Sequence, residues 1–159
     1  MFTKRSLLAL GGFVFICFLA AAVGGWATSS SVGTWYLALN KPSWTPPSWL
    51  FGPMWTTLYL MMAVSAWLVW QRRTEQPVRL ALQVFLFQLI INACWSPIFF
   101  GMRRPDLGFF WIALLWVWIV ITIVLFKKVS PLAALLLVPY LIWVSIAQAL
   151  NFSIWRLNP

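Results

Sequence analysis

Ionisable and metal-binding side chains are scarce in this sequence. It contains no histidine, two acidic residues, Glu75 and Asp106, and two cysteines, Cys17 and Cys94, which lie far apart. A Ser-His-Asp triad, a histidine-based zinc site or a pair of catalytic carboxylates cannot be built from this set. A glycine-rich phosphate loop with a lysine is also missing, which argues against nucleotide-driven chemistry. We therefore expect no metal site and no obligatory cofactor.

Charge is scarce as well, whereas apolar residues are abundant. Only 8% of the 159 residues are charged, 63% are hydrophobic and the mean hydropathy is +0.89. These values lie far outside the range of soluble domains. The net charge of +9 comes from cations that flank apolar runs, as in membrane proteins, and that form no basic stripe for nucleic acid. The chain is predicted to be an integral membrane protein that binds no nucleic acid.

Five apolar runs approach or exceed the roughly 20 residues that a helix needs to cross a bilayer. No alternating pattern typical of barrel strands is visible, and in lipid a helix satisfies its own backbone hydrogen bonds. We therefore predict an all-α membrane protein, a bundle of five transmembrane helices that forms a single domain over residues 1–159. The expected helices cover about 7–27, 47–70, 78–100, 107–126 and 131–155, and a lid loop covers about 28–46.

The first apolar run has two interpretations. Lys4-Arg5, an apolar core and Ala20-Ala21-Ala22 resemble a secretory signal peptide. No long soluble domain that would need export follows, so we expect this run to remain as the first helix.

The basic residues predict an orientation. One side of the bundle would carry seven cations and the other four, and cytoplasmic loops are enriched in Lys and Arg. This favours a cytoplasmic N-terminus in a bacterial inner membrane, with the lid on the opposite side. The seven are Lys4, Arg5, Arg72, Arg73, Arg79, Lys127 and Lys128, and the four are Lys41, Arg103, Arg104 and Arg156.

The segment from Thr34 to Trp55 is unusually rich in aromatic residues and proline. It holds four Trp, one Tyr and four Pro, which is too aromatic for a solvated loop and too rich in proline for a helix. It can be a lid over the bundle, or its aromatic side chains can simply lie at the level of the lipid headgroups.

Three of the expected helices carry an aromatic or polar face. Pro97 is expected to distort the third helix beside its polar face. Such faces suit a pocket for a flat, largely apolar ligand. Alternatively, Gln88 and Asn92 join helices by hydrogen bonds and Ala147 allows close packing. The faces comprise Trp55, Tyr59 and Met62; Gln88, Asn92, Trp95 and Ser96; and Tyr140, Trp143, Ala147 and Asn151.

Several motifs together resemble one family, that of the tryptophan-rich sensory proteins and the mitochondrial translocator protein, or peripheral benzodiazepine receptor. The resemblance covers all five expected helices. It implies a commonly dimeric bundle whose pocket binds porphyrins such as protoporphyrin IX and haem, sterols, and isoquinoline or benzodiazepine-type drugs. The motifs are Trp35-Tyr36, the run from Asn40 to Pro47, Trp55, the run from Asn92 to Phe100 and the run from Val138 to Trp143.

The resemblance also implies site residues. Trp55 and Trp143 match tryptophans implicated in light-dependent breakdown of protoporphyrin, so an enzymatic role stays open. Lys41, Arg103 and Arg104 are candidates to pair with porphyrin propionates, and without histidine any bound haem is expected to lack histidine ligation. The implied pocket residues are Tyr36, Trp44, Pro47, Trp55, Asn92, Trp95, Ser96, Trp143 and Ala147.

The sterol motif of this family is incomplete here. Leu150 and Arg156 are present, but Phe152 holds the position of the motif's tyrosine. Such motifs are weak even when complete, so we expect sterol affinity below that of a member with the tyrosine. The resemblance predicts a receptor or sensor in the membrane; the alternative is a transporter of tetrapyrroles or sterols.

Overall fold

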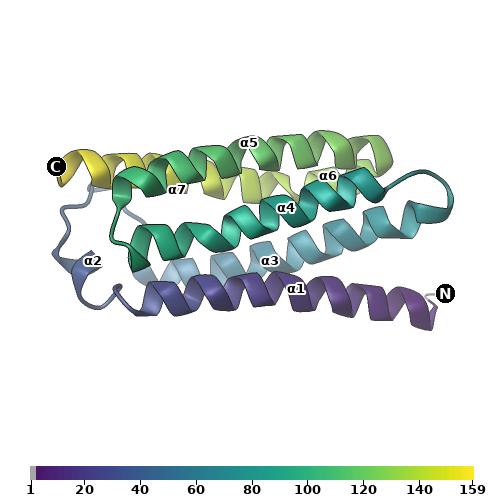
Figure 1. The fold of residues 1–159 in the computed structure, drawn as a ribbon, viewed down its shortest axis with the longest axis horizontal. Coiled ribbons are helices and arrows are strands. Elements are labelled where there is room, and N and C mark those ends of the chain that lie inside the picture. The colour runs from purple at the N-terminus through teal and green to yellow at the C-terminus, as the bar shows by residue number, and fades with distance from the viewer. Residues whose placement is uncertain (1–2) are drawn as a thin grey trace.

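The computed structural model describes residues 3–159 as an elongated bundle in which long helices lie side by side along one axis (Figure 1). Within these described residues, five helical segments are long and apolar enough to cross a membrane, which confirms the predicted all-α membrane fold. The elements are α1 (Lys4–Ser29), α2 (Trp35–Ala38), α3 (Ser48–Gln71), the 3₁₀ turn η1 (Arg72–Thr74), α4 (Arg79–Ser96), the π-helix η2 (Pro97–Gly101), α5 (Pro105–Val129), α6 (Pro131–Leu136) and α7 (Val138–Leu157).

The last transmembrane segment is two helices rather than the single one expected over 131–155. α6 starts after Ser130, whose Oγ accepts a hydrogen bond from the backbone N–H of Ala133 at 3.3 Å. It ends at Leu136, and α7 starts at Val138 with Pro139 in its first turn. Proline has no amide proton to continue the helical ladder, which accounts for the break at Leu137.

The distortion expected at Pro97 takes the form of a π-helix. Proline cannot donate the next hydrogen bond of α4, and the chain continues in a wider turn from Pro97 to Gly101. The amide of Met102 closes this turn on the carbonyl of Pro97 at 2.9 Å. As a consequence, η2 presents Phe99 and Phe100 toward the interior, where both are buried.

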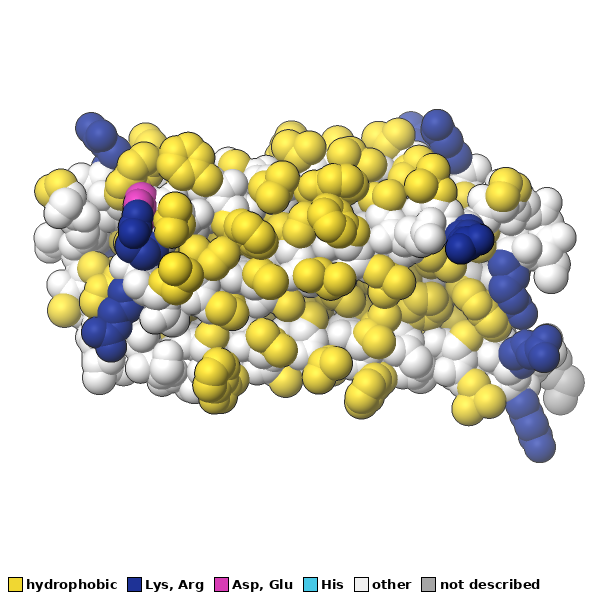
Figure 2. Space-filling view, in the orientation of Figure 1, with side chains coloured by type: hydrophobic (Ala, Val, Ile, Leu, Met, Phe, Trp, Pro, Cys, Tyr) yellow, Lys and Arg dark blue, Asp and Glu magenta, His cyan; other side chains and the backbone are white. Residues whose placement is uncertain are grey.

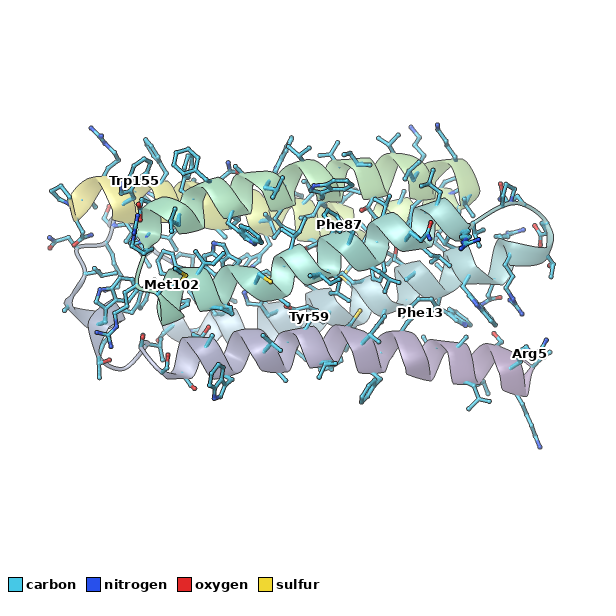
Figure 3. The ribbon with its side chains drawn as sticks, viewed as in Figure 1. Arg5, Phe13, Tyr59, Phe87, Met102 and Trp155 are labelled. Atoms are coloured by element: carbon cyan, nitrogen blue, oxygen red, sulfur yellow. The ribbon has the colours of Figure 1, made fainter. Side chains whose placement is uncertain are left out.

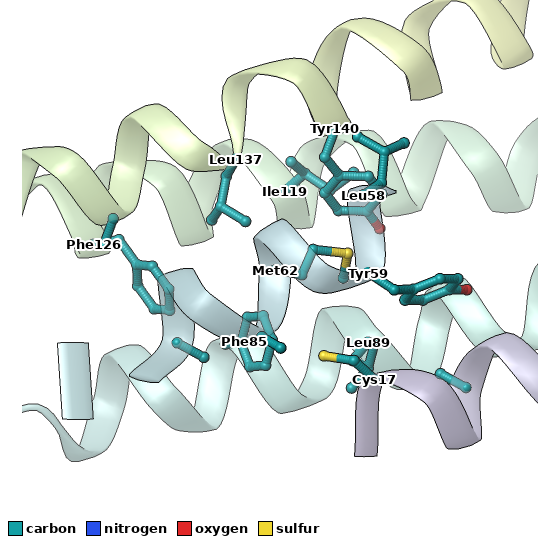
Figure 4. Packing of buried hydrophobic residues seen from close by; sticks show 14 of the residues in the cluster. Cys17, Leu58, Tyr59, Met62, Phe85, Leu89, Ile119, Phe126, Leu137 and Tyr140 are labelled. Atoms are coloured by element: carbon teal, nitrogen blue, oxygen red, sulfur yellow. The ribbon is translucent and has the colours of Figure 1, made fainter. Parts of the chain in front are cut away.

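The apolar core lies in the middle of the bundle, where α3, α4, α5 and α7 meet (Figure 4). Met62, Phe85, Ile119 and Phe126 are fully buried there, and the rings of Phe85 and Phe126 stack at 5.8 Å. The outer surface along the helices is apolar too, whereas Lys and Arg gather toward the two ends (Figure 2). A belt of this kind suits contact with lipid.

Candidate ligand-binding site

A small aromatic cluster closes one end of the bundle beneath the loop that follows α1. We call its buried members, Phe99, Phe100, Leu150 and Ile154, the lid cluster. They come from η2 and α7, which the fold brings together at this end. The segment that covers them includes the short helix α2, so the predicted lid is partly helical. The side chains packed against the lid cluster are Trp35, Tyr36, Leu39, Phe51 and Trp95.

Tyr36 is the aromatic centre of the lid. Its ring centroid lies 5.3 Å from that of Phe100 and 6.2 Å from that of Phe99. The Lys41 ammonium lies 4.8 Å from the Tyr36 ring centroid, a cation–π contact. Burial raises the pKa of Tyr36 above the ordinary value. The phenol therefore stays neutral at physiological pH.

Side-chain hydrogen bonds fix the lid at two points. The hydroxyl of Ser31 donates to the carbonyl of Phe100 at 2.8 Å in a buried contact. Farther along, the backbone N–H of Asn40 donates to Asn158 Oδ1 at 3.0 Å, and Asn158 Nδ2 donates back to the carbonyl of Asn40 at 2.9 Å. We call this reciprocal pair the Asn40–Asn158 clip. It ties the lid to the end of α7.

A chain of polar side chains runs through the interior below the lid. Tyr59 donates to Asn92 Oδ1 at 2.5 Å, Asn92 Nδ2 donates to the hydroxyl of Tyr140 at 2.9 Å, and Tyr140 donates to Gln88 Oε1 at 3.0 Å. All four side chains are buried. They connect α3, α4 and α7, so Gln88 and Asn92 do join helices as the alternative interpretation held. We call these four residues the polar chain.

Two tryptophans of the implied pocket lie on helices that also carry the polar chain, Trp55 on α3 and Trp143 on α7. The ring of Trp55 lies 5.6 Å from that of Tyr59 and 6.3 Å from that of Tyr140. Trp143 packs against Phe51 at 5.6 Å with 6% of its surface exposed, and its indole N–H finds no acceptor among residues 3–159. A second buried donor, Gln88 Nε2, is also unpaired within that range. Unpaired buried donors are rare and costly.

Trp95 and Phe51 connect the interior to the lid cluster, since both contact the main core as well as that cluster. The Trp95 ring stacks on Phe99 at 5.2 Å, and its N–H donates to Asn151 Oδ1 at 3.3 Å. Asn151 Nδ2 in turn donates to the carbonyl of Pro105 at 2.6 Å. The aromatic site therefore extends continuously from the lid to the polar chain.

Gly108 of α5 makes this close packing feasible. A Cβ atom at this position would lie 2.9 Å from Asn151 Oδ1 and 3.0 Å from Cδ2 of Phe99. Such distances are shorter than ordinary van der Waals contacts, so a side chain would displace either the asparagine or the ring. Glycine is needed at this helix crossing because the neighbouring side chains leave no room for a Cβ atom.

The predicted pocket residues are distributed unevenly over this site. Tyr36, Trp55, Asn92, Trp95 and Trp143 lie in the continuous aromatic site just described, and Ala147 packs against the main core. The hydroxyl of Ser96 lies instead beside Gly24 of α1, 3.4 Å from where a Cβ would stand. Trp44 and Pro47 are exposed, Trp44 by 49%, and belong to neither hydrophobic cluster.

The three residues of the incomplete sterol motif do not share one surface. Leu150 is buried in the lid cluster. Phe152 and Arg156, one helical turn apart, are exposed, and the Phe152 ring lies 5.3 Å from that of Phe109. Figure 3 shows the neighbouring Trp155 at the lid end of the molecule, together with Met102. A sterol on this surface would contact Phe152 and Arg156 but not Leu150.

Sequence reasoning missed Phe51, Phe99 and Phe100 as members of the site. A signal was present, because Phe99 follows Trp95 by four residues and so shares its helical face. The effect of the π-helix on Phe100 and the Asn40–Asn158 clip had no local signal in the sequence.

These features define a class: a five-span helical membrane protein with an aromatic interior site beneath a fixed lid. Residues 13–156 match the model of the TspO/MBR family. The chain is 46% identical to protein CrtK of Rhodobacter capsulatus over 91% of both chains. It is 42% identical to the tryptophan-rich protein TspO of Chlorobaculum tepidum, covering 98% of this chain and 99% of that one. It is 41% identical to the human translocator protein, covering 92% and 88%. The chain belongs to the TspO/MBR family, as the motifs predicted.

Proposed function

We propose that this protein is a membrane receptor or sensor that binds flat, largely apolar molecules in the aromatic site, with porphyrins such as protoporphyrin IX and haem as its principal ligands. Family membership supports a sensor or translocator role in the membrane. Sterols and isoquinoline or benzodiazepine-type drugs are further candidate ligands. We further propose a homodimer in a bacterial inner membrane with its N-terminus in the cytoplasm.

The observation that carries the proposal is the unpaired indole N–H of Trp143. It is buried beside Phe51, near the interior end of a site lined by aromatic faces. A ligand that stacks on these rings and presents a carbonyl, carboxylate or ring nitrogen would satisfy this donor. The site thus offers both apolar contact and a directional hydrogen bond, the combination typical of small-molecule sites.

The test is a titration of the detergent-solubilised protein with protoporphyrin IX, followed by tryptophan fluorescence in the dark. We expect saturable quenching in the wild type and weaker binding in Trp143→Phe and Trp55→Phe. Trp49→Phe is the matched control, because Trp49 lies on the surface with 71% of its area exposed. Unchanged affinity in both interior variants would overturn the assignment of the site.

The same titration under illumination tests the enzymatic extension. The Trp55 ring contacts the rings of Tyr59 and Tyr140, and we propose that Trp55 and Trp143 support light-dependent loss of the bound porphyrin. Loss of pigment in the wild type but not in Trp55→Phe or Trp143→Phe is the expected result. Binding without any loss of pigment would leave a receptor and reject the photochemical role.

Transport is the second candidate function, favoured by the name translocator protein that the human relative carries. It predicts directional uptake of a tetrapyrrole or sterol into sealed vesicles that contain the protein. A receptor would bind the same molecule without moving it, so equal uptake by vesicles with and without the protein would reject this candidate.

A further inference from the structure

A shallow cavity of about 370 Å³ lies at the end of the bundle opposite the lid. It opens between the end of α3 and the junction of α5 with α6. Because the transmembrane helices end here, the cavity lies at the boundary between the hydrocarbon core and the lipid headgroups. Its walls are mixed: Leu68, Val129, Pro131 and Leu132 are apolar, and Gln71, Arg72, Glu75 and Ser130 are polar.

Hydrogen bonds between elements hold the walls of this cavity in place. The hydroxyl of Ser65 donates to the carbonyl of Ala133 at 2.7 Å, which holds α6 against α3. The Gln76 Nε2 amide donates to the carbonyl of Val129 at 3.2 Å, which ties the connection after α3 to the end of α5. These two bonds tether α6 and the end of α5 to α3 and its connection, beside the cavity.

Positive charge gathers at the end of the bundle where the cavity opens, and Arg72 lines the cavity itself. This end carries the seven cations counted above against Glu75 alone. Arg72 Nη1 pairs with Glu75 Oε2 at 2.8 Å, with side-chain exposures of 53% and 58%. Arg73 stacks over the ring of Trp70 at 3.3 Å, and Lys127 and Lys128 occupy the last turn of α5, next to Val129. Pairing with one acid leaves most of this charge uncompensated.

We propose that the cavity binds an anionic phospholipid, with the phosphate at the basic rim and the upper part of the acyl chains against the apolar wall. Arg72 uses one N–H for Glu75 and has others available to donate to a phosphate oxygen. The uncompensated lysines attract an anionic headgroup more strongly than a zwitterionic one. Each cation should raise the affinity for the anionic lipid roughly fivefold. This site is separate from the aromatic site and does not depend on its proposed function.

The test compares two short-chain lipids, dioctanoyl phosphatidylglycerol and dioctanoyl phosphatidylcholine, bound to the full chain in detergent and counted by native mass spectrometry. We expect the wild type to bind dioctanoyl phosphatidylglycerol, the anionic lipid, in preference to dioctanoyl phosphatidylcholine. The triple variant Arg72→Gln/Lys127→Gln/Lys128→Gln is expected to lose at least tenfold in affinity for it. Glu75→Gln, which removes the acid at the rim, should bind it more tightly.

Two controls separate this cavity from general electrostatic attraction. Arg103→Gln/Arg104→Gln/Arg156→Gln removes the same number of charges from the other end and should bind like the wild type. Leu68→Trp fills the cavity without changing any charge and should weaken binding as strongly as the triple variant. It also keeps the proposal testable if the triple variant fails to fold.

Three outcomes would overturn the proposal. They are equal retention of the two lipids, an unchanged affinity in Leu68→Trp, and an equal loss in both charge-removal variants. Inorganic phosphate is added at the lipid concentration as a further arm. Displacement of the lipid by phosphate alone would show that the site recognises a free anion, and it too would contradict binding of a lipid.

Discussion

At the lid end of the bundle, a long connection is held by aromatic contacts and side-chain hydrogen bonds, whereas at the opposite end short connections lie among cations. At the lid end, the half-buried Tyr36 packs on the buried Phe99 and Phe100, and the Asn40–Asn158 clip closes the lid. At the opposite end, an exposed ion pair joins Arg72 and Glu75. The comparison indicates that contacts with strict geometry, packed rings and hydrogen bonds between elements, are concentrated at the lid end. Substitutions at that end should therefore lower the stability more than substitutions at the opposite end.

The largest effect is expected for Gly108→Leu in the crowded crossing of α5, α7 and η2. The new side chain would displace Asn151 or Phe99 and break the hydrogen bond from Trp95. Overpacking of this kind typically lowers the free energy of unfolding by about 1–3 kcal/mol. The loss of stability is measured as a shift in the midpoint of SDS-induced unfolding, followed by circular dichroism.

Gly12→Leu in α1 is the matched control for this substitution. A Cβ at Gly12 would meet no atom within 4 Å, while the gain in helix propensity is the same at both positions. Equal midpoints for the two variants would show that the crossing at Gly108 is not crowded in the folded protein.

The next effect concerns the interior polar chain, which Tyr140→Phe would interrupt. The variant keeps the ring but removes the hydroxyl that accepts from Asn92 and donates to Gln88. Hydrogen bonds between membrane helices contribute about 0.6–2 kcal/mol, so a loss in that range is expected in the same SDS titration. Tyr36→Phe is the control, since the Tyr36 hydroxyl makes no hydrogen bond within residues 3–159. A similar loss of stability in Tyr140→Phe and Tyr36→Phe would contradict a stabilising role for the hydrogen bonds of the Tyr140 hydroxyl.

A smaller effect is expected for Asn158→Ala, which opens the clip at the edge of the lid. Both hydrogen bonds are exposed, and single bonds contribute about 0.5–1.5 kcal/mol net. The amide of Asn40 should exchange its hydrogen severalfold faster, as measured by hydrogen–deuterium exchange, with little change in the SDS midpoint. Ser153→Ala removes a bond within α7 only and should leave this amide protected. Unchanged exchange in Asn158→Ala would mean that the lid is held elsewhere.

Much of the fold can be predicted from the sequence, because a helix that crosses lipid must be apolar over a known length and must turn its polar side chains toward the protein interior. Apolar length determines the five spans, and the spacing of Gln88 and Asn92 predicts their shared, buried face. The lid cluster is harder to predict, since the π-helix that begins at Pro97 turns Phe100 away from the direction that a regular α-helix would give it. The clip joins residues 118 positions apart and depends on tertiary structure alone. The exposure of Trp44 and Pro47 likewise follows from how the lid lies.

The smallest effects concern the two ion pairs found within residues 3–159, which lie at the surface, one at each end. Exposed pairs contribute little because water and salt screen them. Asp106 nevertheless stands in the first turn of α5, where the helix dipole favours a negative charge, and Arg104 binds it through two nitrogens at 2.8 and 2.6 Å. Glu75 follows the end of α3, where the dipole disfavours an acid. Asp106→Asn should therefore lower the thermal midpoint slightly and Glu75→Gln should not, and the difference should vanish in high salt. A larger loss in Glu75→Gln, or a difference that persists in high salt, would reverse this ranking of the two ends.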